Sequence, residues 1–350
     1  MPRPVDVIVQ PTCSARESLA ADRVFLEQAK GRPGVLRIHA FPGDVLSLGR
    51  YHLVPPAVAA EVTLWRRLSG GRPMASGDGF VGVSLVLPHR SALVADDPLA
   101  LDPPQVLNRC VRGLLEACKL AGVAAFYPGR DAITVNQRIV GLLSLEVDDT
   151  GATLFEAILA VGRDFSLLPA LLDRVDPGGV VKAGMLFPHD VTSLAGELGG
   201  APAFAQVVEW LCAGYPARLD VECRPRDLTP AERAAIAAAA AGEFADARWL
   251  GERAPRPDLD RRASLPTQLG VLEVHFALTN GAIRDVVLTG DFIAGSGAVA
   301  RLERALRGCP AEVEAVAAVV ERVFAEPGSF LLGVMPLRAI AEAIGGGLAA

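Results

Sequence analysis

The sequence predicts an α+β protein in which a mixed sheet flanked by helices precedes a smaller α+β domain. Two observations predict this class. Over residues 35–161, short apolar runs typical of strands are interspersed with amphipathic helical stretches. Later in the chain, Asn280 and Gly281 separate two apolar runs, and an Asn-Gly pair at such a position favours a β-hairpin. We therefore expect a first domain over residues 1–225 and a second over residues 226–350.

The first predicted helix covers residues 14–30 and begins at a capping box. In this pair, Ser14 and Glu17 each bond to the backbone of the other residue. A second helix, over residues 106–120, is predicted from apolar residues at helical spacing. Strands are expected at 35–41, 45–48, 62–65, 80–87, 132–135, 140–147 and 153–161.

A change of character near residue 226 marks the second predicted domain. Thr229 and Glu232 form another capping box, with Pro230 at the first helical position. Residues 253–266 are rich in Pro, Arg and Asp and are expected to form a linker. The hairpin strands are expected at 271–278 and 283–288, and helices at 298–306, 311–324 and 336–344.

Composition excludes several classes of function. The 350 residues carry a formal net charge of −6 without a basic run, so nucleic-acid binding driven by phosphate neutralisation is not expected. No apolar run reaches the roughly 18 residues that a membrane-spanning helix needs. The N-terminus lacks the apolar segment of a signal peptide. We expect a cytoplasmic protein that binds neither nucleic acid nor membrane.

Cysteine and histidine residues are scattered along the chain. The six Cys contain no C-x-x-C pair and the five His no H-x-x-x-H pair, so no protein-bound metal is expected. Cys110 and Cys118 lie on the apolar side of the helix over residues 106–120 and are expected to be core residues. Without a signal peptide, all thiols are expected to be reduced.

Residues 66–72 (RRLSGGR) carry the most specific chemical signal. Two successive Gly let a ligand approach the backbone, because no Cβ is in the way. The guanidinium of Arg offers a planar donor fork that matches phosphate or carboxylate oxygens. The segment therefore predicts an anion site, and an ordinary surface hairpin with solvated Arg side chains is the alternative.

Several segments, in order, resemble the lipoate–protein ligase and octanoyltransferase family. Residues 46–51 are similar to a strand end of that family, and residues 66–72 to its Arg-Arg-x-Ser/Thr-Gly-Gly signature. Residues 126–141 are similar to its Asn-Asp…Ile-x-Gly segment. The second domain is similar to the accessory domain of bacterial lipoate ligases at residues 270–275, 280–283, 290–292 and 302–308. The resemblance spans nearly the whole chain and implies the catalytic fold that this family shares with biotin–protein ligases.

The resemblance implies ATP-dependent attachment of lipoate to a lysine of a lipoyl carrier domain. Lipoate would attack the α-phosphate of ATP to give lipoyl-adenylate, and the carrier lysine would then attack the acyl carbon. Mg²⁺ would screen the triphosphate. The implied partners are apo lipoyl domains of 2-oxoacid dehydrogenases or the glycine cleavage H protein, with lipoate and ATP as small molecules.

The matching positions imply a set of site residues. Asp131 would be a partner for the attacking lysine or a metal, and its alternative role is to cap a turn. The residues implied to contact the acyl-adenylate are Arg50, Arg67, Ser69, Gly70, Gly71 and Arg72. For Arg50, an ordinary surface position at a strand end is an equal alternative.

Arg138 stands where the family has a Lys. Arg keeps the positive charge and can keep an electrostatic role. Its pKa stays above about 12, so it cannot accept a proton. Lys182 is the nearest Lys that follows in the sequence, and it is either an adenylate contact or a solvated side chain. The surrounding residues 173–192 are a candidate lid.

Two other functions stay open. An ATP-independent octanoyl or lipoyl acyltransferase would need an activated thiol, and no Cys lies between Cys118 and Cys212. A degenerate, non-catalytic member of the family would bind an acyl-adenylate or a lipoyl domain without turnover. Arg138 and the absence of the family's His at two positions, near Ser76 and at Phe155-Glu156, support this last possibility.

Overall fold

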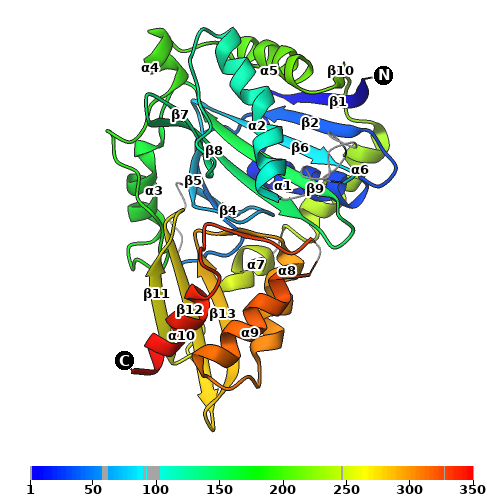
Figure 1. Cartoon of the computed structure of the whole chain (residues 1–350). Helices are drawn as coiled ribbons and strands as arrows, with labels where there is room; N and C mark the ends of the chain where they lie inside the picture. The colour runs from blue at the N-terminus through cyan, green and yellow to red at the C-terminus, as the bar shows by residue number, and fades with distance from the viewer. Residues whose placement is uncertain are drawn as a thin grey trace.

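The first domain of the protein lies above the second in Figure 1, with the N-terminus in the upper part and the C-terminus at the bottom. The computed structural model describes residues 2–56, 62–89, 92, 103–245, 247–326 and 328–349. The two-domain α+β class expected from the sequence is confirmed, with a mixed sheet in one domain and small sheets with helices in the other.

The first domain is built on a seven-stranded sheet in the order β10-β1-β2-β6-β9-β8-β7. Strand β1 is parallel to both β10 and β2, and the remaining neighbours pair antiparallel. Strands β2, β6 and β9 are buried along their whole length, which explains their continuous apolar runs. The strands are Arg3–Gln10 (β1), Gly34–His39 (β2), Phe80–Leu87 (β6), Ala132–Val135 (β7), Arg138–Val147 (β8), Thr153–Ala160 (β9) and Val221–Pro225 (β10).

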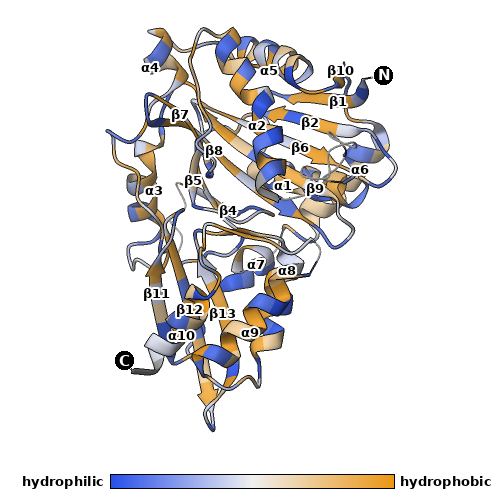
Figure 2. Cartoon of the chain, viewed as in Figure 1, coloured by the Kyte–Doolittle hydropathy of each residue, from blue (hydrophilic) through white to orange (hydrophobic). Residues whose placement is uncertain are grey.

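Helices cover both faces of this sheet. Consecutive residues of β1 point to opposite faces: Val7 belongs to the apolar cluster of α2 and α5, and Ile8 to that of α1 and α6. Figure 2 shows the strands between these helices as mainly hydrophobic. The helices of this part are Ala15–Glu27 (α1), Pro103–Leu120 (α2), Leu168–Val175 (α3), Leu194–Leu198 (α4), Phe204–Arg218 (α5), Pro230–Ala241 (α6) and Ala247–Leu250 (α7), with single 3₁₀ turns at Phe165–Leu167 and Gly251–Arg253.

A second, three-stranded sheet lies between the large sheet and the second domain (Figure 1). Its central strand β3, Asp44–Leu48, is parallel to β4, Thr63–Arg66, and antiparallel to β5, Met74–Gly77. The Arg- and Gly-rich segment singled out from the sequence connects β4 to β5. It therefore lies at the junction of the two domains.

The second domain contains the predicted hairpin. Strands β12, Val271–Thr279, and β13, Ala282–Gly290, pair around Asn280 and Gly281, both of which have positive φ as a type I′ turn requires. The other elements are strands Arg261–Pro266 (β11), Ile293–Ala294 (β14) and Leu331–Leu332 (β15), and helices Ser296–Leu306 (α8), Val313–Phe324 (α9) and Ala339–Ala349 (α10).

Some elements differ from the expectation. Residues 261–266, inside the expected linker, form β11, which pairs with β12. Helix α6, expected to open the second domain, packs on α1 because its Ile236 and Ala240 join the apolar cluster of that helix. Strand β1 and helix α5 were not predicted. Both predicted capping boxes, at Ser14 and Thr229, are confirmed.

The helices of the described residues were compared with the length and hydropathy of a membrane-spanning helix. None of the helices in this part of the chain combines the length and the apolar character that crossing a bilayer requires. The cellular compartment stays a prediction.

Candidate functional site

Residues 66–72, called the Arg-Gly turn below, are buried throughout, so the solvated-hairpin alternative is wrong. The guanidinium of Arg67 folds back on its own segment and donates to the carbonyls of Ser47 (3.0 Å), Gly70 (2.9 Å) and Arg72 (3.0 Å). Its Nε is buried and has no hydrogen-bond partner among the described residues. Burial lowers the pKa of Arg67 to about 10. Arg67 thus holds the shape of the turn and leaves one buried N–H without a hydrogen bond to the described part of the chain.

Arg66 has a similar internal role on the other side of β4. Its guanidinium donates to the carbonyls of Arg50 (2.7 Å), His52 (2.6 Å) and Leu250 (2.7 Å). Burial lowers its pKa to about 9. The sequence predicted that Arg66 and Arg67 would bind an anion. In this structure, both guanidinium groups instead bind backbone carbonyls and connect the segments that carry them.

The third Arg of the turn does hold an anion, and it is a carboxylate of the chain itself. Arg72 Nε lies 2.6 Å from Asp131 Oδ2, and Arg72 Nη2 lies 3.1 Å from Asp131 Oδ1. Both side chains are buried, and this bidentate geometry is the strong form of the Arg–carboxylate pair. The structure therefore brings two of the sequence-predicted site residues together.

Ser69 also binds an internal carboxylate. Its hydroxyl donates to Glu156 of β9. Burial raises the pKa of Glu156 to about 7, with a further rise from Asp22, while Arg67 and the hydrogen bonds from Ser69 oppose the shift. Glu156 is thus a buried carboxyl group that titrates near neutral pH.

Glu156 belongs to a row of polar side chains that crosses the large sheet. Arg37, Ser84, Glu156 and Ser144 are direct neighbours on β2, β6, β9 and β8. Directly opposed residues share one face of a sheet. Ser144 donates to the carbonyl of Gly70 (2.7 Å), and Arg37 and Ser84 both bind Asp22 of α1. This polar row forms the floor beneath the Arg-Gly turn.

The two glycines of the turn are required by protein packing. A Cβ on Gly70 would lie 2.3 Å from the carbonyl oxygen of Phe292 in the second domain. Gly71 has φ of +86° and donates its N–H to the same oxygen at 2.6 Å. The ring of Phe292 stacks on Tyr51 at 4.4 Å. The close approach predicted for a ligand is therefore made here by the second domain.

The remaining predicted residues lie outside the turn. Arg50 pairs with Glu252 at 3.1 Å and lies over the ring of Trp249. Arg138 starts β8, is 44% exposed and pairs with Glu197 at 2.6 Å. The length of β7 separates it from Asp131, about 13 Å for four strand residues. The structure does not bring Asp131 and Arg138 into contact.

Lys182 lies in a long connection between α3 and α4, residues 176–193, called the Lys182 loop below. Near its start, Asp176 accepts from the N–H groups of Val180 and Val181 within the loop. Near its end, Ile139 of β8 donates to the carbonyl of Asp190 and accepts from the N–H of Thr192. Lys182 is half-buried. Because Ile139 follows Arg138, one end of the loop lies beside that residue.

The thiols of Cys110 and Cys118 belong to core residues, as expected from the sequence. All six Cys are free, and burial raises the pKa of Cys110 and of Cys118 to about 12. Such thiols lack the thiolate character of a nucleophile. Among the described residues, no group of three or more His, Cys, Asp or Glu side chains could hold a metal.

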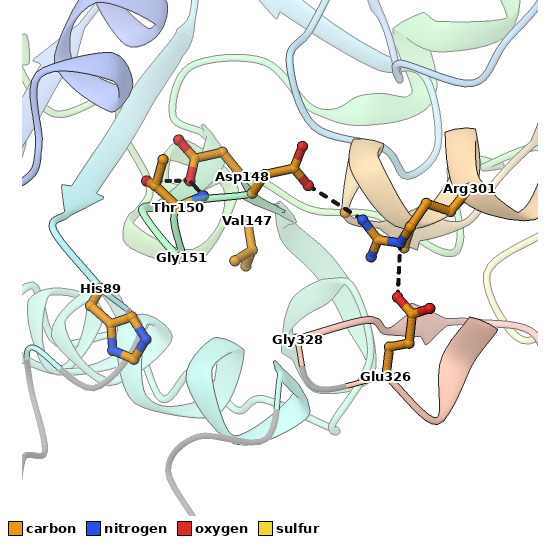
Figure 3. Close-up of a pocket in the computed structure, with 11 residues that line it drawn as sticks. His89, Val147, Asp148, Thr150, Gly151, Arg301, Glu326 and Gly328 are labelled. Atoms are coloured by element: carbon orange, nitrogen blue, oxygen red, sulfur yellow. Dashed lines mark hydrogen bonds and ion pairs between the residues drawn. The ribbon is translucent and has the colours of Figure 1, made fainter. Parts of the chain in front are cut away.

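A crevice of about 380 Å³ lies at the domain junction, between the loop joining β8 to β9 and helix α8. Figure 3 shows Arg301 of α8 reaching across it toward Glu326, and Arg301 lies 3.0 Å from Glu326 and 3.4 Å from Asp149. The predicted site residues do not line this crevice. Arg301 therefore links the β8–β9 loop to residues after α9 through two of the acidic side chains there.

Sequence reasoning missed several residues of the site, including Asp22, Ser144, Asp291 and Phe292. A usable signal existed for some of them. Ser84, Ser144 and Glu156 interrupt otherwise apolar strand runs, and a polar residue inside a buried strand needs a partner. The partner itself could not be identified without the strand register.

The comparisons with known proteins concern the second domain and the overall fold. Residues 256–329 match the family model for the bacterial lipoate protein ligase C-terminus. No curated protein matches the chain. The second domain thus resembles that C-terminal domain in sequence.

Solved structures are similar to the overall fold of this chain. LipL1 of P. falciparum, in complex with lipoate, has a TM-score of 0.66 at 12% identity, over 97% of this chain and 98% of its own. A lipoate-protein ligase A bound with ATP has a TM-score of 0.57 at 16% identity, over 72% and 99%. The bi-partite lipoate protein ligase of Thermoplasma acidophilum, described with its E2 lipoyl domain, has a TM-score of 0.58 at 16% identity, over 73% and 98%.

Proposed function

We propose that this chain attaches lipoate to the lysine of a lipoyl carrier domain, through a lipoyl-adenylate made with ATP. The observation that carries the proposal is the whole-chain likeness to a lipoate-bound ligase, over 97% of the residues. The match of residues 256–329 to the ligase C-terminal domain supports it independently. An apo lipoyl domain of a 2-oxoacid dehydrogenase or a glycine cleavage H protein is the proposed partner.

The proposed first step joins two anionic reactants. A carboxylate oxygen of lipoate attacks the α-phosphorus of ATP, and pyrophosphate leaves. Positive charge near the reacting oxygens lowers the barrier. The groups proposed to supply it are the free Nε of Arg67, Arg138 and Lys182. Arg138 would exchange its partner Glu197 for the nucleotide, and Lys182 would approach from its loop.

In the proposed second step, the amine of the carrier lysine attacks the acyl carbon and AMP leaves. Asp131, oriented by Arg72, is the carboxylate proposed to face that lysine. Mg²⁺ bound by nucleotide phosphates commonly needs only one or two protein carboxylates. Both carboxylate oxygens of Asp131 face Arg72 and the side chain is buried, so either role requires this pair to open first.

The test is the intact mass of an apo lipoyl domain after incubation with this protein, lipoate, ATP and Mg²⁺. A lipoyl-sized gain that disappears without ATP is expected. If the lipoyl domain instead gains an octanoyl-sized mass from octanoyl carrier without ATP, the protein is the acyltransferase. The thiols argue against that outcome because burial raises the pKa of all six.

A non-catalytic role is the second candidate, and one observation favours it. The Arg-Gly turn is filled with internal contacts: Arg66 and Arg67 hold carbonyls and Arg72 holds Asp131. A degenerate member would bind lipoyl-adenylate or a lipoyl domain and release neither AMP nor a modified carrier. Saturable binding without AMP release, in the same preparation, would support this role.

A further inference from the structure

One buried carboxylate of the second domain contacts three segments at once. Asp291 follows β13 and is fully buried. Its Oδ1 lies 3.0 Å from His52 Nε2, just beyond β3. Its Oδ2 accepts from the N–H of Val271 at 2.9 Å and from the N–H of Gly184 at 2.6 Å. A buried charge on a single side chain therefore ties the second domain to two separate parts of the first.

Gly184 lies in the Lys182 loop, two residues beyond Lys182. The first domain also holds the loop, because Val181 and Leu186 are buried in an apolar cluster with Leu48 of β3. Asp291 binds the backbone between these two residues from the opposite domain. The position of Lys182 therefore depends in part on a contact that crosses the domain boundary.

The local backbone is built for this contact. A Cβ on Gly270, which has φ of +148°, would lie 2.0 Å from Asp291 Oδ2. A Cβ on Gly184 would lie 3.0 Å from the Cα of Gly270. Two glycines thus let the loop and the second domain approach until the carboxylate fits between them. Such close packing is not needed for an ordinary surface connection.

The same segment also reaches the Arg-Gly turn. Phe292, the next residue, accepts the N–H of Gly71 through its carbonyl. Consecutive residues of the second domain therefore hold the Lys182 loop and the Arg-Gly turn. Residues 291 and 292 thus connect these two candidate substrate-binding segments through the second domain.

We infer that Asp291 is a positioning residue, through which the second domain sets the Lys182 loop against the Arg-Gly turn. The inference rests on the proposed function for its catalytic consequence, because that function gives Lys182 a nucleotide to contact. The coupling itself is a property of the contacts and is open to measurement in the protein without substrates.

Hydrogen exchange of the full chain tests the coupling. Asp291→Ala is expected to speed exchange in the peptide that contains Gly184 by about tenfold or more, because that N–H loses its acceptor. Asp285→Asn, which removes a second-domain charge paired with Arg256 and Arg307 at the surface, is the matched control and should leave that peptide unchanged. Unchanged protection in Asp291→Ala, with the β12–β13 peptides still protected, would overturn the inference.

A second variant covers the case in which Asp291→Ala does not fold. Gly184→Ala leaves the contacts of Asp291 with His52 and Val271 in place but pushes the loop backbone away from Gly270. It should loosen the same peptide and leave the hairpin protected. Retained protection of the loop in a folded Gly184→Ala protein would also count against the inference.

Steady-state kinetics give the readout that a purely structural role would not move. Loss of folded protein lowers the apparent kcat and leaves KM unchanged, whereas a displaced loop raises the KM for ATP. We expect about a tenfold higher KM in Asp291→Ala and Gly184→Ala, and no change in Asp285→Asn. An unchanged KM would overturn the catalytic part. An inactive wild-type protein would contradict the proposed function instead, and the exchange result would still decide the coupling.

Discussion

The Arg-Gly turn and the Lys182 loop use charged residues in opposite ways. In the turn, three guanidinium groups are buried, and their partners are carbonyls or a carboxylate of the chain. Arg138, on β8 beside one end of the loop, is 44% exposed, and Lys182, within the loop, is half-buried. The comparison indicates that the Arg side chains of the turn build the framework, whereas the more exposed positive charges lie on and beside the loop.

The largest expected effect comes from breaking the buried pair in the turn. Asp131→Ala leaves Arg72 buried without its anion and should lower the free energy of unfolding by about 3–5 kcal/mol. Glu197→Ala removes the partner of exposed Arg138 and should cost below about 1 kcal/mol. Urea unfolding of the two variants measures both values. Equal losses would remove the distinction between the two regions.

The next effect is a pH dependence centred on Glu156. Its pKa in the folded protein, about 7, lies above the ordinary value of 4.5. The folded state therefore binds the proton more tightly, and this stabilisation is complete below about pH 4.5 and lost as the pH rises through 7. The change is at most about 3 kcal/mol, at about 1.4 kcal/mol per pKa unit.

Glu156→Gln is the matched variant for this prediction, since it keeps the shape and cannot titrate. Its stability should fall less than that of the wild type between pH 5 and 8 in urea unfolding. The pKa of Glu146, raised by burial to about 7 beside Ser296, adds a similar slope that Glu156→Gln leaves in place. Parallel curves for wild type and variant would show that Glu156 does not carry the effect.

Gly70→Ala tests whether the turn is closed by the second domain. The new methyl group would meet the carbonyl of Phe292 at 2.3 Å, and overpacking of this kind costs about 1–3 kcal/mol. Gly178→Ala, in the Lys182 loop, has open space around its Cβ and should stay within about 0.5 kcal/mol. Calorimetric melting compares them. If Gly70→Ala leaves the melting temperature unchanged, the contact between the turn and Phe292 can open without loss of stability.

The smallest effect on stability is expected at Arg138. Arg138→Ala removes an exposed ion pair and should change the unfolding free energy by below about 1 kcal/mol. Its effect on lipoyl transfer should be large, about 100-fold, because the proposed role is electrostatic. Arg138→Lys should restore much of the rate. Full activity in Arg138→Ala would remove this residue from the proposed site.

The sequence supported the fold further than the site. Local signals sufficed for α1 and for the β12–β13 hairpin, because a capping box and an Asn-Gly turn act within a few residues. Strand β1 was missed although Val5, Val7 and Val9 recur at strand spacing. Its partner β10 lies far along the chain, so no local turn signals the pairing. Asp291 was missed because its partners, His52 and Gly184, are brought together only by domain packing.

The pairing of β1 with β10 has a consequence for synthesis of the protein. Arg3 aligns with Val221, so the first strand to be synthesised pairs with the last strand of its sheet. At ribosomal rates of roughly 5–20 residues per second, the delay is about 10–40 s. During that time one edge of β1 is open, and an open edge readily pairs with another chain. Nascent chains halted before residue 221 should therefore depend on chaperones, whereas chains released just beyond β10 can close the sheet unaided.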